Sequence, residues 1–240
     1  MEGKNLAKLF DSEKPIIGMI HLAGSSARER VRRGIGELIV YYEENISGAI
    51  IEDYHGTMDD VCEVLKESEK LDLDITRGVN ALGNPYSSFG LASDFGAKFV
   101  QFDSVHTRDL NVGAYFLLRK QYHDIFVLGG VGFKYIAPTG NPLERDLEEG
   151  KQKCDAIVTT GAGTGIETPI GKLKEYKKIL GNFPLIVGAG ANARNLKEQL
   201  AVADGAIIGS YFKPEGDTLL PVDRNLVRDI AGISAEIRRA

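Results

Sequence analysis

Five polar side chains that can move protons or stabilise charge stand at the ends of the first five apolar runs of this sequence or shortly after them. They are His21, Glu52, Asn80, Asp103 and Lys134. A histidine or a carboxyl group can act as a general acid or base, and a lysine can form a Schiff base with a carbonyl substrate. For each residue alone, a local hydrogen bond or a structural ion pair is the alternative. The whole set predicts a catalytic cluster.

Glycine-rich segments follow the last apolar runs, at Gly188–Asn192 and Gly209–Lys213, and a third occupies residues 160–165. Glycine lets main-chain N–H groups approach an anion closely, and the start of a following helix adds unpaired donors. We therefore predict a phosphate site here, with Lys213 as a point charge. The residues predicted to contact the phosphate are Gly163, Gly188, Gly190, Gly209, Ser210 and Lys213. Tight turns without a ligand are the alternative.

No motif in the sequence specifies a metal or a cofactor. The patterns HExxH and HxH are both absent. We predict no dedicated metal site, and Mg²⁺ held by Glu52 and Asp103 together with a substrate phosphate stays open. FMN bound at the same glycine loops is a further alternative. The cofactor is therefore unknown at this stage.

The elements that must position these residues are eight short, apolar runs rich in β-branched side chains. They lie at Pro15–His21, Gly48–Asp53, Leu73–Val79, Lys98–Phe102, Ile125–Gly129, Asp155–Thr159, Pro184–Val187 and Gly205–Gly209. Most show little strict alternation of apolar and polar residues, which is typical of strands buried on both faces of a parallel sheet.

Stretches with helical spacing separate these runs and complete eight β/α units. They lie at Val31–Glu44, Asp59–Lys70, Tyr86–Phe95, Leu110–Tyr122, Leu143–Lys153, Ile170–Leu180, Ala193–Val202 and Asp223–Arg238. A doubly wound open sheet is the competing α/β architecture, but the first run is not followed by GxGxxG. We predict one domain over residues 1–240, an α/β fold of the (β/α)8 TIM-barrel class. Its active site belongs at the carboxyl ends of the strands.

Composition excludes several classes of protein. The net charge of −5 over 240 residues, without a basic stripe, argues against nucleic-acid binding. Cys62 and Cys154 stand in no CxxC pair, which favours a reducing compartment. The first ten residues do not form a signal peptide, and no run of about 18 apolar residues predicts a membrane span. We expect a cytoplasmic protein, and a homo-oligomer stays open.

Several segments together resemble the BtpA/SgcQ family over nearly the whole chain. The most specific are the first strand, Ile17–Leu22, and the tail, Ala203–Lys213 followed by Pro221–Arg224. Further similar segments are Gly48–Glu52, Gly78–Asn80, Val131–Ala137 and Asp155–Gly165. The resemblance implies a TIM barrel. It also implies a link to photosystem I accumulation, from which the family takes its name, although similar proteins occur in organisms without photosynthesis.

The chain departs from the family pattern in three loops. Residues 23–28 form a shorter loop than the proline-rich one of relatives, and Ala81–Asn84 replaces a Leu-Arg-acidic segment. The segment Phe102–Ser104 replaces the usual Val-Asn. These differences put the substrate contacts of the first, third and fourth loops in question.

Three functions are compatible with the sequence. The first is an enzyme that acts on a small phosphorylated metabolite, such as a sugar phosphate or a nucleotide-like compound. It would be a lyase, an isomerase, or a glycosyl- or phosphoribosyl-type enzyme. The second is a non-catalytic assembly factor of the photosystem I biogenesis type, because a fold does not determine a function. The third is an FMN-binding barrel.

Overall fold

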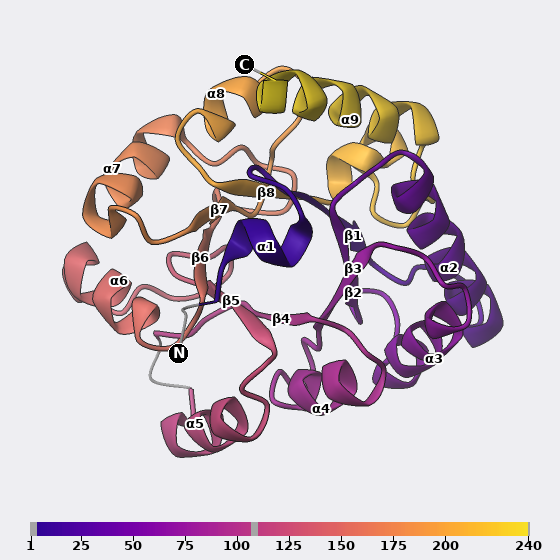
Figure 1. Ribbon diagram of the computed structural model, residues 1–240, viewed down its shortest axis with the longest axis horizontal. Helices are drawn as coiled ribbons and strands as arrows, with labels where there is room; N and C mark the ends of the chain where they lie inside the picture. The colour runs from indigo at the N-terminus through magenta and orange to yellow at the C-terminus, as the bar shows by residue number, and fades with distance from the viewer. Residues whose placement is uncertain (1–3, 107–109, 240) are drawn as a thin grey trace.

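Eight parallel strands form a closed barrel in the computed structural model, which describes residues 4–106 and 110–239 (Figure 1). The strands are β1 Ile16–Ile20, β2 Gly48–Glu52, β3 Thr76–Asn80, β4 Phe99–Phe102, β5 Phe126–Gly130, β6 Ala156–Thr159, β7 Leu185–Val187 and β8 Gly205–Ile208. Each strand pairs with the next in the chain, and β8 pairs with β1, where Ile17 lies opposite Ile207. The predicted (β/α)8 barrel is confirmed.

Helices surround the barrel in an outer ring (Figure 1). The helices of this ring are α2 Ala27–Glu43, α3 Met58–Glu69, α4 Ser87–Asp94, α5 Val112–Gln121, α6 Leu143–Lys151, α7 Ile170–Leu180, α8 Leu196–Leu200 and α9 Arg224–Arg239. Two short 3₁₀ helices, η1 Ser210–Phe212 and η2 Pro214–Gly216, follow β8. The strands are almost completely buried because the helices cover their outer side and side chains fill the barrel.

A short N-terminal helix that the sequence analysis did not predict, α1 Leu6–Phe10, lies across the barrel opening in Figure 1. Its Leu6 and Phe10 are buried among the side chains that fill the barrel. The Phe10 ring packs edge-on against Phe99, with 5.2 Å between ring centroids. Gly48 and Gly78 make room for these rings: a methyl group on Gly78 would lie 2.3 Å from the Phe99 ring. The end of the barrel opposite the predicted site is therefore closed.

Two further features concern the described residues. Cys62 and Cys154 both carry free thiols. None of the helices within residues 4–106 and 110–239 has the length and apolar character that a membrane crossing requires.

Candidate functional site

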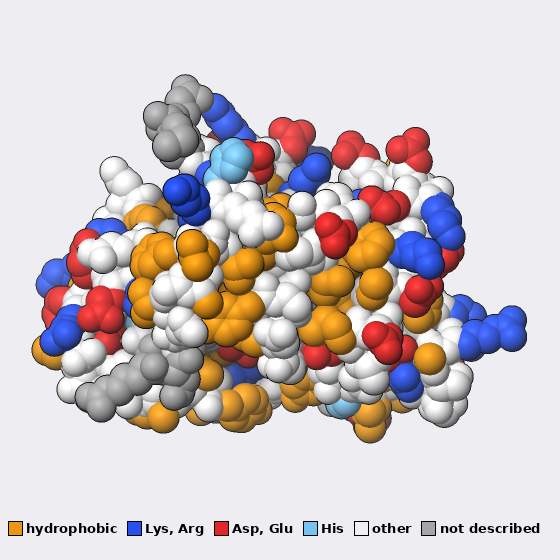
Figure 2. Space-filling model, turned by 90° about the horizontal axis from the view of Figure 1, so that it is seen from below, with side chains coloured by type: hydrophobic (Ala, Val, Ile, Leu, Met, Phe, Trp, Pro, Cys, Tyr) orange, Lys and Arg blue, Asp and Glu red, His pale blue; other side chains and the backbone are white. Residues whose placement is uncertain are grey.

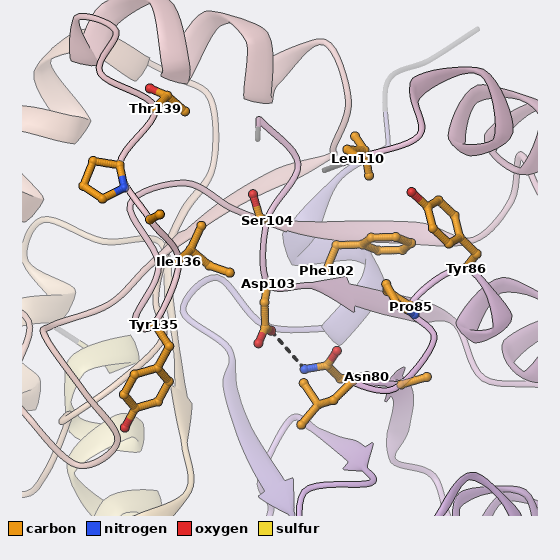
Figure 3. A pocket seen from close by; sticks show the side chains of 14 residues that line it. Asn80, Pro85, Tyr86, Phe102, Asp103, Ser104, Leu110, Tyr135, Ile136 and Thr139 are labelled. Atoms are coloured by element: carbon orange, nitrogen blue, oxygen red, sulfur yellow. Dashed lines mark hydrogen bonds between the residues drawn. The ribbon is translucent and has the colours of Figure 1, made fainter. Parts of the chain in front are cut away.

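An asparagine joins two carboxyl groups at the mouth of the barrel. The Asn80 side-chain amide donates to Glu52 Oε1 at 2.7 Å. It also donates to Asp103 Oδ1 at 3.1 Å, the hydrogen bond drawn in Figure 3. Gln101 donates a second hydrogen bond to Asp103 Oδ1 at 2.9 Å. The barrel brings these groups together because β2, β3 and β4 are neighbours and Glu52 lies opposite Asn80 in the register. Three predicted site residues thus form one hydrogen-bonded unit.

Burial controls the protonation of this unit. Removal of Glu52 from water, with the Asp103 charge nearby, raises the pKa of Glu52 to about 8, although Lys134 and Asn80 oppose the shift. Burial also raises the pKa of Asp103. At pH 7 Glu52 is therefore largely protonated, and it can give up a proton and take one back close to neutral pH.

Lys134 lies on the loop after β5 and faces the same space. Its amine donates to Thr164 Oγ1 at 3.1 Å, and its main-chain N–H donates to Thr160 Oγ1 at 2.6 Å. A residue that sequence reasoning missed supports this loop: the Lys172 amine in α7 donates to the carbonyls of Gly132 and Thr160, both at 2.7 Å. No local sequence signal marked Lys172.

His21, at the end of β1, is buried and neutral. Burial, and then the charges of Lys213 and Lys134, lower its pKa well below the ordinary value. Among the described residues its Nδ1 finds no hydrogen-bond partner. A side chain at Gly209 would start 2.9 Å from His21 Cε1, so glycine there lets the imidazole lie against the loop after β8.

These groups surround a cavity of about 130 Å³, here called the central cavity. The predicted residues on its lining are His21, Glu52, Asp103, Lys134, Gly190, Gly209 and Ser210. The structure thus brings four of the predicted catalytic side chains together with three of the predicted phosphate residues. Gly163 and Gly188 do not line this cavity.

A second hollow of about 580 Å³ lies beside the central cavity, between the loops after β6, β7 and β8; it is called the loop-8 hollow. Ser210, Asn192 and Arg194 line it, together with the acidic Glu215. Within the described residues, the main-chain amides of Gly209 and Ser210 donate no hydrogen bond, so both can bind a ligand. Arg194 makes no ion pair with another described residue. It was not among the predicted phosphate residues, although it follows the glycine-rich segment Gly188–Asn192.

Two predicted phosphate glycines serve packing in this structure. The Gly188 amide donates to the Thr159 carbonyl at 2.8 Å, and a methyl group there would lie 2.6 Å from Val158. Gly190 adopts φ +70°, and a methyl group on it would lie 2.3 Å from the Glu167 backbone. Glycine at these positions lets the loops after β6 and β7 pack closely.

Lys213 lines the loop-8 hollow, but its amine already has a partner. Its amine donates to Glu37 Oε1 in α2 at 2.6 Å, and both side chains are almost completely buried. The predicted point charge for phosphate is therefore bound to a carboxylate. Glu37 lies 176 residues earlier in the chain, so no local pattern could reveal this pair.

Glu52 and Asp103, the two carboxyls considered for Mg²⁺, both contact the Asn80 amide. Within residues 4–106 and 110–239, no three His, Cys, Asp or Glu side chains form a group that could hold a metal ion. Mg²⁺ at the two carboxyls would need substrate oxygens or water as further ligands, so it stays a prediction.

The fold and the site together define a (β/α)8 barrel with an ionisable cluster at the carboxyl ends of its strands. The BtpA family model matches residues 55–236, so the chain belongs to the BtpA family. The chain is 28% identical to a protein of Pyrococcus abyssi, over 94% of this chain and 97% of that one. It is 24% identical to the photosystem I biogenesis protein BtpA of Synechocystis, over 91% of this chain and 87% of the relative.

Two solved structures share the fold. The N-(5'-phosphoribosyl)anthranilate isomerase of Pyrococcus furiosus superposes with a TM-score of 0.62 at 15% identity, over 93% of this chain and 99% of that one. The native KDPGal structure gives a TM-score of 0.65 at 12% identity, over 95% and 98% of the two chains. At these identities the likeness concerns the barrel architecture alone.

Proposed function

We propose that this protein is an enzyme that binds a small phosphorylated metabolite and uses Glu52 to transfer a proton. The observation that carries the proposal is the Glu52 carboxyl itself. It is buried at the mouth of the barrel, shares the Asn80 amide with Asp103, and has a pKa of about 8. A carboxyl group kept neutral near pH 7 beside a cavity is suited to general acid–base catalysis.

The other groups of the central cavity fit supporting roles in such a reaction. Lys134 can stabilise negative charge that develops on the substrate, and neutral His21 can donate or accept a hydrogen bond. Asp103 can take the opposite proton-transfer role to Glu52, because two neighbouring carboxyls titrate at different pH. Such a set supports an isomerase, a lyase, or a glycosyl- or phosphoribosyl-type enzyme.

The phosphate end of the substrate belongs in the loop-8 hollow. The loops after the last two barrel strands commonly hold phosphate in this fold. The free Ser210 amide and the Arg194 guanidinium, which both line the hollow, support this placement, whereas Glu215 opposes it. Lys213 lines the same hollow, so it stays a predicted phosphate residue beside Arg194.

Thermal unfolding with a panel of phosphorylated metabolites, including phosphoribosyl compounds, tests the proposal. A true ligand at a hundred times its Kd stabilises the protein by about 2.7 kcal/mol. With Arg194→Ala, at least ten times more ligand should be needed for the same stabilisation. Arg239→Ala, at the far end of α9, should need no more ligand than the wild type. Glu52→Gln should retain binding and abolish turnover of the ligand. A panel without any stabilising compound would contradict the proposal.

A protein-binding scaffold is the second candidate, and one surface feature supports it. Hydrophobic side chains gather on the face formed by α4 and α5 (Figure 2). On α5 they include the exposed Val112, Phe116 and Leu117, the last 70% exposed. This function predicts a stoichiometric protein partner that co-purifies equally with the wild type and with Lys134→Met, but not with Leu117→Asp.

A further inference from the structure

A third and larger hollow opens beside the carboxyl pair. Its volume is about 900 Å³, and it lies between the loops after β3 and β5; it is called the side pocket. Figure 3 shows Pro85, Tyr86 and Phe102 on one side of it and Tyr135 and Ile136 on the other. The hydrogen-bonded Asn80 and Asp103 side chains lie between the two walls.

The chemistry of the side pocket differs from that of the loop-8 hollow. Its described lining is rich in aromatic and proline side chains, and Asp103 is the one carboxylate or cation on it. Such a surface repels a second anion and suits a flat, uncharged group that stacks on aromatic rings. The carbonyl of Asn80 and the Asp103 carboxyl can accept hydrogen bonds from ring N–H groups.

The three spaces adjoin one another in a row across the mouth, and this row is called the tract. The side pocket and the central cavity share Leu82, Asp103 and Tyr135 on their linings. The central cavity and the loop-8 hollow share Gly165, Gly190 and Ser210. A ligand that lies along this tract therefore passes over Glu52 between its two ends.

Both walls of the side pocket are fixed by specific contacts. Asp53 accepts hydrogen bonds from the amides of Leu82 and Gly83, at 2.7 and 3.3 Å, and thus holds the loop after β3. Tyr135 adopts φ +62°, a conformation that costs a non-glycine residue free energy. Its hydroxyl donates to Thr164 Oγ1 at 3.3 Å and accepts from the Thr164 amide at 3.0 Å. The contacts hold this ring, which is 73% exposed, at the border of two spaces.

We propose that the substrate has two parts: a phosphate bound in the loop-8 hollow and a planar, uncharged ring bound in the side pocket, with the reacting bond between them at Glu52. A ring joined to a phosphorylated sugar, as in a nucleoside monophosphate or a related phosphoribosyl compound, has this layout. The phosphate end rests on the proposed function, whereas the ring end rests on the side pocket alone.

Isothermal titration calorimetry with ribose 5-phosphate, the four nucleoside 5'-monophosphates and the four nucleosides tests this inference. At least one nucleotide should bind ten times more tightly than ribose 5-phosphate. Tyr135→Ala should reduce this advantage to less than threefold and leave ribose 5-phosphate unchanged. Tyr135→Phe, which keeps the ring but loses its contacts with Thr164, should keep more of the advantage than Tyr135→Ala does. The control Tyr42→Ala on α2 should keep all of it, and thermal unfolding checks that each variant is folded.

The outcomes separate the two ends of the substrate. Equal binding of ribose 5-phosphate and every nucleotide, weakened by Arg194→Ala, would overturn the ring site and leave the proposed function intact. Binding of a nucleoside that depends on Tyr135, without any effect of phosphate or of Arg194→Ala, would support the ring site and contradict the phosphate end. No binding by any of these probes would overturn both.

Discussion

At the scale of the residue, the central feature is one amide shared by two acids. The Asn80 NH₂ group has two N–H donors, and the structure uses it for Glu52 and for Asp103. The amide stabilises the charged form of each carboxyl but brings no charge of its own, so burial still dominates both pKa values. The pair therefore holds at least one proton near neutral pH.

This arrangement predicts an unusual dependence of stability on pH. An ordinary glutamate has a pKa of 4.5, whereas Glu52 in the folded protein has a pKa of about 8. The folded state therefore binds the proton more tightly than the unfolded state does. The resulting stabilisation is complete below pH 4.5 and is lost as the pH rises through 8. The free energy of unfolding should fall by up to about 1.4 kcal/mol per pH unit in this window.

Urea unfolding at several pH values measures this slope. Glu52→Gln should flatten it, and Asp103 and Glu37, whose pKa values are also raised, should contribute to the dependence that remains. The exposed Glu63→Gln on α3 is the control and should keep the wild-type slope. Identical slopes in the wild type and in Glu52→Gln would show that Glu52 titrates normally in the folded protein.

At the scale of the element, a buried ion pair fastens the segment after β8 to α2. Lys213 follows η1, and Glu37 lies in the middle of α2. Burial raises the pKa of Glu37 and lowers that of Lys213, while each partner opposes the shift of the other. The pair therefore positions Gly209 and Ser210, a few residues before Lys213, at the edge of the central cavity.

Breaking this pair from one side should be costly. Lys213→Met should lower the free energy of unfolding by about 3–5 kcal/mol, because Glu37 is left buried and unpaired. The double variant Glu37→Leu/Lys213→Met should recover most of that loss. If the double variant still binds a phosphorylated ligand with wild-type affinity, Lys213 is not a phosphate contact. A tenfold loss in a stable double variant would show that the pair supports binding, either by direct contact or by positioning Gly209 and Ser210.

At the scale of the whole molecule, the two ends of the barrel have different roles. The carboxyl ends of the strands hold the three hollows, whereas α1 packs Leu6 and Phe10 into the interior from the opposite end. This division keeps water out of the barrel core and leaves the site to the loops. Changes at the closed end should therefore affect stability without affecting the site.

Phe10→Ala tests this division. The lost ring contacts with Phe99 and the cavity left behind should lower the free energy of unfolding by about 3–5 kcal/mol. Ligand affinity, measured by calorimetry, should stay within twofold of the wild type, because α1 lies away from the mouth. The control Leu71→Ala, at a partly exposed position after α3, should change stability by less than about 0.5 kcal/mol. A coupled loss of affinity in Phe10→Ala would show that the two ends communicate.

The sequence by itself determined the architecture and the side of the barrel that carries the site. Eight apolar runs with helical stretches between them require eight β/α units, and parallel strands of a closed barrel end at one rim. The polar residues at or shortly after the end of each run could therefore be assigned to the mouth without coordinates. His21, Glu52, Asp103 and Lys134 do line one cavity there.

Only the tertiary structure decided how these and other side chains are paired. Lys213 binds Glu37 across 176 residues, Lys172 holds two carbonyls from the side of α7, and α1 closes the barrel. The spacing of apolar residues predicts helices and strands, because residues that are close in the chain lie in the same element. Contacts between distant elements depend on how the closed barrel places them, and no pattern within a single segment records that placement.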